Sequence, residues 1–148
     1  MDEKQIQYED DVLITNDVAR AIEEGELVAY FHPMMDIASN SVVAAEALVR
    51  WTLADGTIVP AGLFVPSLER THTIEGLDWV MAELVSTYLE NTGGDMGCVP
   101  ISLNLSDQHA TDDDFAERLL STLEWHGVDA VMVRAEVSAE KLLEDMGE

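Results

Sequence analysis

The chain has 148 residues, of which 30 are aspartate or glutamate and 7 are lysine or arginine, so its formal net charge is −23 with neutral histidines. A protein that binds DNA or RNA through phosphates needs a basic surface, and anionic membranes attract basic segments. The composition therefore argues against nucleic acid and membrane surfaces as partners. Hydrophobic residues make up 47% and charged residues 25%, which is typical of a folded globular domain rather than a disordered chain.

The compartment is indicated by what the sequence lacks. The single cysteine, Cys98, cannot form an internal disulfide. The first residues are acidic, unlike a basic and apolar leader peptide, and no apolar run approaches the ~18 residues of a membrane span. We therefore expect a cytoplasmic protein.

The first half of the chain predicts one helix and two strands. Residues 1–12 form an acidic lead, and residues 13–148 form a single domain. Its first helix is expected to begin at Asn16, a good N-cap, and to end at Gly25. Two apolar runs follow at 27–37 and 42–51. Because only turn-prone residues separate them, they predict antiparallel neighbouring strands. The stretch 52–76 is expected to be irregular.

The second half predicts alternating helices and strands. An apolar stripe predicts a helix from 77 to about 91, and a strand follows at about 99–105. Three aspartates at 112–114 suit the first turn of the next helix. A strand at about 131–137 precedes a short helix that carries Leu142, Leu143 and Met146. This alternation predicts a parallel sheet with one antiparallel strand at its start.

Three predicted strands each carry one strong oxygen ligand on the face opposite their apolar side chains. These ligands are Glu46, Asn104 and Glu136. A parallel sheet is normally covered on both faces, so a charged side chain there costs several kcal/mol unless something compensates. Two carboxylates and an amide oxygen, without cysteine or histidine, are typical ligands of a hard cation. The pattern therefore predicts Mg²⁺ or Mn²⁺ rather than zinc.

Arg50 lies four residues after Glu46 on the same predicted face. A guanidinium group there is suited to hold a phosphate through two parallel hydrogen bonds. The alternative is that Glu46 neutralises Arg50, and Glu136 neutralises Arg134, on a solvated face. The spacing favours neither explanation.

The segment 45–51, Ala-Glu-Ala-Leu-Val-Arg-Trp, resembles the signature of EAL domains, bacterial phosphodiesterases that hydrolyse cyclic di-GMP. Other segments resemble the family in the same order along about residues 13–140. They are Gly-Glu-Leu-Val-Ala-Tyr-Phe-His-Pro (25–33), Val-Pro-Ala-Gly-Leu-Phe-Val-Pro (59–66), Leu-Asp-Trp-Val (77–80), Ser-Leu-Asn-Leu-Ser (102–106) and Glu-Val-Ser (136–138).

The resemblance implies a (β/α)8 barrel whose first strand is antiparallel. It implies that Glu46, Asn104 and Glu136 ligate the catalytic Mg²⁺ or Mn²⁺, which polarises the phosphodiester and activates water to give linear pGpG. Arg50 would contact a substrate phosphate, and Leu48 and His32 are the other candidates for substrate contact. His32 stands where the family has a glutamine.

The chain also departs from the family at two other motif positions and in its length. Arg70-Thr71-His72 replaces an acidic-Thr-Gly turn, and Ala139 replaces a glutamate. A (β/α)8 barrel takes about 250 residues. The family's paired aspartates, its lysine and its later glutamate lie beyond the fourth strand. We therefore expect a partial, TIM-like α/β barrel of about four strands with little or no phosphodiesterase activity by itself.

Two other functions stay open at this point: a degenerate module that binds cyclic di-GMP, and a protein-interaction module. The fourth strand would present unpaired backbone groups at its outer edge. We therefore expect a homo-oligomer, or another chain that covers this edge.

Overall fold

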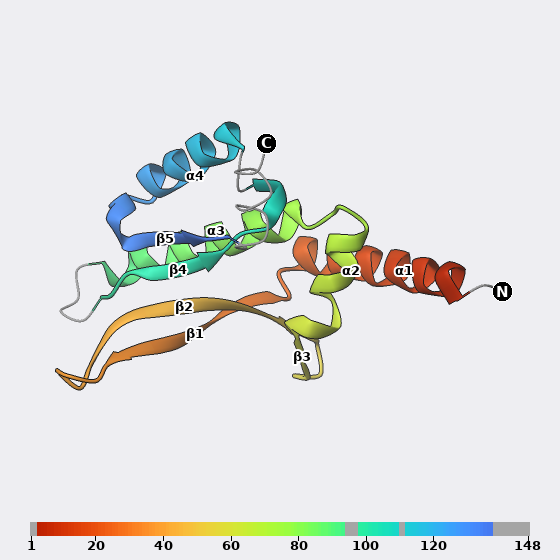
Figure 1. Ribbon diagram of the computed structural model, residues 1–148, viewed down its shortest axis with the longest axis horizontal. Coiled ribbons are helices and arrows are strands. Elements are labelled where there is room, and N and C mark those ends of the chain that lie inside the picture. Colours follow the sequence, from red (N-terminus) through yellow and green to blue (C-terminus); the bar gives the residue numbers. More distant parts are fainter. Residues whose placement is uncertain (1–2, 94–97, 110–111, 138–148) are drawn as a thin grey trace, which may run out of the picture.

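The computed structural model describes residues 3–93, 98–109 and 112–137 (Figure 1). Successive strands dominate the first half of this length, and helices and strands alternate from residue 75 onward. In chain order they are α1 (Glu3–Glu24), β1 (Leu27–Asp36), β2 (Ser41–Thr52), β3 (Ile58–Pro60), the 3-10 turn η1 (Ala61–Leu63), α2 (Val65–Arg70), α3 (Glu75–Thr92), β4 (Ile101–Asn104), the 3-10 turn η2 (Asp107–His109), α4 (Asp113–Trp125), the 3-10 turn η3 (Ala130–Met132) and β5 (Val133–Glu136).

One sheet organises these elements, with the strand order β1-β2-β4-β5. β2, β4 and β5 are parallel to one another, whereas β1 is antiparallel to β2, as the sequence predicted. β1 and β2 form a long hairpin whose turn lies away from the helices (Figure 1). The short strand β3 pairs with Arg50–Thr52 of β2.

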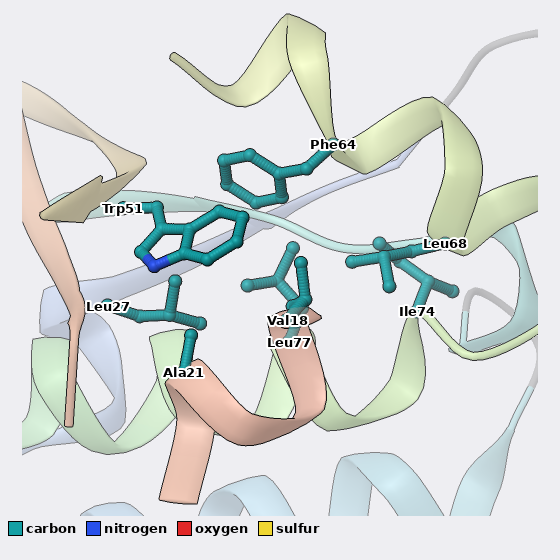
Figure 2. Close-up of a cluster of buried hydrophobic side chains, with 8 residues drawn as sticks. All are labelled: Val18, Ala21, Leu27, Trp51, Phe64, Leu68, Ile74 and Leu77. Atoms are coloured by element: carbon teal, nitrogen blue, oxygen red, sulfur yellow. The ribbon is translucent and has the colours of Figure 1, made fainter. Parts of the chain in front are cut away.

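Two hydrophobic clusters hold the helices against this sheet. In the first, α3 packs its apolar stripe on the face of β2 and β4 that the alternation predicted; the buried members are Ala47, Met81, Ala82, Val85, Leu89, Ile101 and Leu103. The second joins α1 and α2 to the carboxyl end of β2, and Figure 2 shows its members: Val18, Ala21, Leu27, Trp51, Phe64, Leu68, Ile74 and Leu77. Within it the rings of Trp51 and Phe64 meet edge to face at 5.8 Å.

The predicted start of the first helix at Asn16 is wrong. α1 begins at Glu3 and runs through the residues expected to form a solvated acidic lead. The reason is tertiary: Asp11 is buried, and its carboxylate accepts two hydrogen bonds of 2.7 Å from the Arg70 side chain on α2. An acidic residue in this helix is therefore a buried anchor.

The stretch 52–76 is also more regular than predicted, because it contains β3, η1 and α2. The three aspartates at 112–114 do stand at the start of α4, with Asp113 and Asp114 in its first turn. Asp112 is the N-cap, and its carboxylate accepts from the Asp114 N–H at 3.0 Å. The helix expected to carry Leu142, Leu143 and Met146 lies outside the described residues. Within the described ranges, no helix has the length and apolar character to cross a membrane.

Candidate functional site

The three oxygen ligands predicted from the strand pattern lie on one face of the sheet. Glu46 is aligned with Ser102 across β2 and β4, and Asn104 is aligned with Glu136 across β4 and β5. Aligned residues of neighbouring strands point to the same face, as do residues two apart on one strand. The amide Nδ2 of Asn104 donates a 2.8 Å hydrogen bond to Glu46 Oε1. The fold thus brings Glu46 and Asn104 into contact and aligns Glu136 with Asn104 on the next strand.

The ion pairs of the described residues do not support mutual neutralisation. None of them joins Glu46 to Arg50 or Glu136 to Arg134. The Arg50 Nη1 instead donates to the Val49 carbonyl at 2.7 Å, and the guanidinium carbon lies 5.9 Å from the centre of the Tyr30 ring. The positive charge of Arg50 therefore remains available to an anion.

Backbone pairing along β2 explains the position of Arg50. Alternate residues of a strand direct their N–H and C=O groups to opposite edges. The Ala45 N–H donates to Pro100 next to β4, whereas the Thr52 N–H donates to Glu26 next to β1. β3 and β4 pair with the same edge of β2, β4 along Ala45–Ala47 and β3 along Arg50–Thr52. The backbone N–H and C=O of Val49 face this edge in the gap between the two strands. The Arg50 guanidinium supplies a donor for the Val49 carbonyl there.

A cavity of about 210 Å³ opens at this interval. It lies toward the carboxyl ends of β2 and β4, the end at which (β/α)8 barrel proteins bind their ligands. Its walls are mostly apolar, with a few polar groups; the lining residues are Ala47, Leu48, Val49, Arg50, Ala61, Val65, Glu69, Ile74, Leu77, Asp78, Met81, Asn104, Leu105 and Ser106. Arg50, Leu48 and Asn104 are therefore gathered at one place.

His32 occupies a different position. It is aligned with Glu46 across β1 and β2, so the two side chains share a face, and it is exposed. The residues that line the cavity do not include it. The structure thus places His32 beside the predicted ligand Glu46 and outside the cavity.

A buried polar cluster next to the cavity was missed by the sequence analysis. Asp78 on α3 accepts two hydrogen bonds from Ser106 and contacts Nδ1 of His109 at 2.8 Å. Asp78 is 5% exposed and His109 7% exposed. The sequence did carry one signal of a buried carboxylate: Asp78 stands directly beside Leu77, at the start of the apolar stripe of α3.

The chemistry of the donor set fits a hard divalent cation. Glu46 and Glu136 offer carboxylate oxygens and Asn104 an amide oxygen on adjoining strands, and Mg²⁺ and Mn²⁺ prefer such ligands. Among the described residues, no group of three or more His, Cys, Asp or Glu side chains is arranged to hold a metal. The candidate site differs from such groups because one of its three ligands is an amide.

The chain is similar to parts of longer curated proteins. The chain is 25% identical over 121 residues to PdeB of Escherichia coli, a probable cyclic di-GMP phosphodiesterase, covering 80% of this chain and 23% of PdeB. It is 26% identical over 129 residues to an uncharacterized protein of Mycobacterium tuberculosis, covering 86% of this chain and 21% of that protein. The chain therefore spans about a fifth of the length of these curated relatives.

The fold is that of a solved EAL domain. The FimX EAL domain of Xanthomonas citri, crystallised in complex with c-diGMP, superposes with a TM-score of 0.82 at 10% identity, over 97% of this chain and 55% of that one. This likeness confirms the prediction of a partial TIM-like α/β barrel. The model of the EAL domain matches residues 15–148. The chain therefore belongs to the EAL domain family, which includes cyclic di-GMP phosphodiesterases.

Proposed function

We propose that this chain supplies the metal-binding and phosphate-binding part of a cyclic di-GMP phosphodiesterase site. The contact between Glu46 and Asn104, on the same face as Glu136, carries the proposal. Arg50 lines the adjoining cavity without a carboxylate partner among the described residues. The names of the relatives, which include PdeB, support the choice of substrate.

Glu46, Asn104 and Glu136 would hold Mg²⁺ or Mn²⁺. When bound, the ion would polarise the phosphodiester and activate water. The chain's own contribution is to hold the ligands on three neighbouring strands, where the ladder of hydrogen bonds fixes their spacing. With a net charge of −23, the chain repels an anionic nucleotide, so a cation at this site also lowers the barrier to binding.

Arg50 would bind a phosphate of the substrate. Its guanidinium is held by one hydrogen bond to a carbonyl and by the face of Tyr30, and both contacts can be exchanged for a phosphate. Leu48 offers the cavity an apolar surface for part of a nucleoside. His32 lies beside Glu46 in place of the family's glutamine, so we propose that it alters how guanine is recognised.

We further propose that these 148 residues bind cyclic di-GMP without hydrolysing it efficiently. The resemblance implies that the paired aspartates and the lysine of the family have no counterparts among the positions matched here. Glu46, Asn104 and Glu136 would then hold a metal and the substrate. The two further aspartates and the lysine that the family uses for hydrolysis would be missing from the site. A module that binds cyclic di-GMP as a signal would have the same properties.

Isothermal titration calorimetry with cyclic di-GMP, with and without Mn²⁺, tests the proposal. Arg50→Ala is expected to weaken binding about 10-fold to 100-fold, since a hydrogen bond to a charged group contributes roughly 1.5–3 kcal/mol. Glu46→Ala is expected to abolish the effect of Mn²⁺. Arg134→Ala is the matched control, because Arg134 is a cation on the same face that does not line the cavity.

Chromatography of the nucleotide after incubation with Mn²⁺ separates binding from hydrolysis. We expect cyclic di-GMP to be recovered intact. Turnover to pGpG at a rate usual for the family would contradict the proposed lack of hydrolysis. Absence of binding by the unaltered chain, or equal affinities for the Arg50→Ala and Arg134→Ala variants, would contradict the proposed site.

A further inference from the structure

A buried carboxylate on α3 lies directly behind the end of β4. Asp78 Oδ2 accepts hydrogen bonds from the Ser106 N–H at 3.1 Å and from the Ser106 hydroxyl at 2.6 Å, and the His109 Nδ1 lies 2.8 Å from the same oxygen. A buried carboxylate is costly unless it is hydrogen-bonded. These donors are therefore held firmly, and the backbone that carries them is fixed with them.

This backbone is the continuation of the strand that carries Asn104. The Leu105 N–H donates to the Glu136 carbonyl at 2.9 Å, so β5 holds the segment from one side. Asp78 holds it from the other side through Ser106 and His109. The segment from the end of β4 through η2 is thus clamped between α3 and β5.

His109 extends the clamp to α4. Its ring stacks on Phe115 at 4.0 Å with an interplanar angle of 17°, and Phe115 also contacts Trp79 at 4.4 Å. Trp79 follows Asp78 on α3, so the cluster ties one turn of that helix to both η2 and α4. A stacked and buried imidazole has little freedom to leave the carboxylate.

The side chain of Asn104 itself is exposed. Packing therefore does not set its direction, and its contact with Glu46 depends on where the backbone places it. Residues outside the ligand set that orient a metal ligand commonly change metal affinity 10-fold to 100-fold when they are replaced. The ladder with β5 holds Asn104 itself, and the buried carboxylate of α3 holds Ser106, two residues further along the same segment.

We infer that Asp78 is a positioning residue for Asn104: by holding Ser106 and His109, it keeps the Asn104 amide within reach of Glu46. The inference rests on the proposed function only where it concerns the metal. The geometric part concerns the hydrogen bond between Asn104 and Glu46 itself.

The experiment follows Asn104 directly in the full 148-residue chain. Asp78→Asn keeps the size of the side chain and removes its charge, and Ser106→Ala removes one of the three donors. Two controls separate other effects. Glu75→Gln removes a charge from the exposed start of the same helix, and Arg70→Ala breaks the anchor to Asp11 at a distance from β4. The side-chain amide of Asn104 is observed by proton–nitrogen correlation NMR, and Mn²⁺ affinity by electron paramagnetic resonance.

Asp78→Asn is expected to shift the Asn104 amide signals toward those of a free side-chain amide and to weaken Mn²⁺ binding about 10-fold to 100-fold. Ser106→Ala should shift the Asn104 amide signals and weaken Mn²⁺ binding in the same direction, but by smaller amounts. Glu75→Gln and Arg70→Ala should leave the amide signals in place, even if Arg70→Ala lowers the melting temperature.

Unchanged Asn104 signals in both Asp78→Asn and Ser106→Ala would overturn the inference, whatever happens to metal binding. If Asp78→Asn does not fold by circular dichroism, Ser106→Ala alone decides between the two results. If the unaltered chain binds no Mn²⁺, the proposed function fails, but the amide signals still decide whether Asp78 positions Asn104.

Discussion

His72 has a left-handed backbone conformation, with a φ of 55°. For a residue other than glycine this conformation costs roughly 1–2 kcal/mol. Glycine avoids that cost. Its greater conformational entropy in the unfolded chain, however, lowers the free energy of unfolding by about 0.4–1 kcal/mol. We therefore predict that His72→Gly stabilises the chain by about 0.5–1 kcal/mol, as measured by urea unfolding.

The control for this prediction is Gln108→Ala. It removes the weak contact between Gln108 Nε2 and His72 Nδ1, which are 3.5 Å apart, and leaves the backbone unchanged. Its stability should equal that of the unaltered chain. A less stable His72→Gly variant would show that the side chain of His72 contributes more than its backbone conformation costs.

Arg70 shows where prediction from the sequence fails at single residues. In the sequence it is only a departure from the family's acidic-Thr-Gly turn, and Asp11 is only one acid in an acidic segment. In the structure the two form one anchor, and the Arg70 guanidinium holds the pKa of Asp11 well below its usual range. They lie 59 residues apart, so no local pattern connects them.

At the scale of elements, α3 and α4 are joined by a histidine between two carboxylates. His126 lies at the end of α4, with Nε2 3.0 Å from Glu83 and Nδ1 2.7 Å from Glu90. A neutral imidazole carries one N–H, so only the protonated ring donates to both. The two carboxylates of α3 accordingly raise the pKa of His126.

A stability that depends on pH follows from this junction. A histidine whose pKa is raised on folding stabilises fully below its unfolded pKa, about 6.5, and loses that contribution as pH rises through the folded pKa. We predict that the melting temperature of the chain, relative to that of His126→Gln, falls as pH increases above 6.5. Differential scanning calorimetry in a series of buffers measures this difference.

The matched variant for this test is the double replacement Glu83→Gln, Glu90→Gln. It keeps His126 and removes both acceptor charges, so its melting temperature should change less over the same range. An equal slope for the double variant and the unaltered chain would show that other groups cause the pH dependence.

The elements differ in how well the sequence predicts them. The faces of β2 and β4 follow from alternation, because Ala45, Ala47 and Ile101 must be buried wherever helices cover the sheet. β3 and α2 have three and six residues, too few to show a period. β3 pairs with β2 and packs Val59 against the cluster of Figure 2, and α2 packs Leu68 into that cluster. Both elements therefore depend on residues that are distant in the sequence.

At the scale of the whole molecule, the charge of −23 makes the folded chain repel itself. Added salt screens this repulsion, and the screening length falls from about 10 Å at 0.1 M to about 3 Å at 1 M. We predict that KCl raises the melting temperature, with most of the rise below about 0.5 M. A rise that is linear to high concentration would indicate salting-out of apolar surface instead.

The outer strands of the sheet and the hairpin tip lead us to predict association. Within the described residues, no further strand pairs with β1 or β5 on their outer sides. Met35 and Ile37 at the hairpin are 51% and 95% exposed. Because repulsion opposes contact between copies, dimers or larger oligomers should form more readily in KCl. A monomeric mass by light scattering at every salt concentration would contradict this prediction.

The hydrogen bond from Arg50 to the Val49 carbonyl would make the proposed binding of a phosphate an exchange. If the guanidinium turned to a phosphate, it would leave behind an acceptor at the interval between β3 and β4. An acceptor that stays unsatisfied costs about 1–3 kcal/mol. We therefore expect the proposed site to favour ligands that bring an N–H or O–H donor to the Val49 carbonyl together with their phosphate.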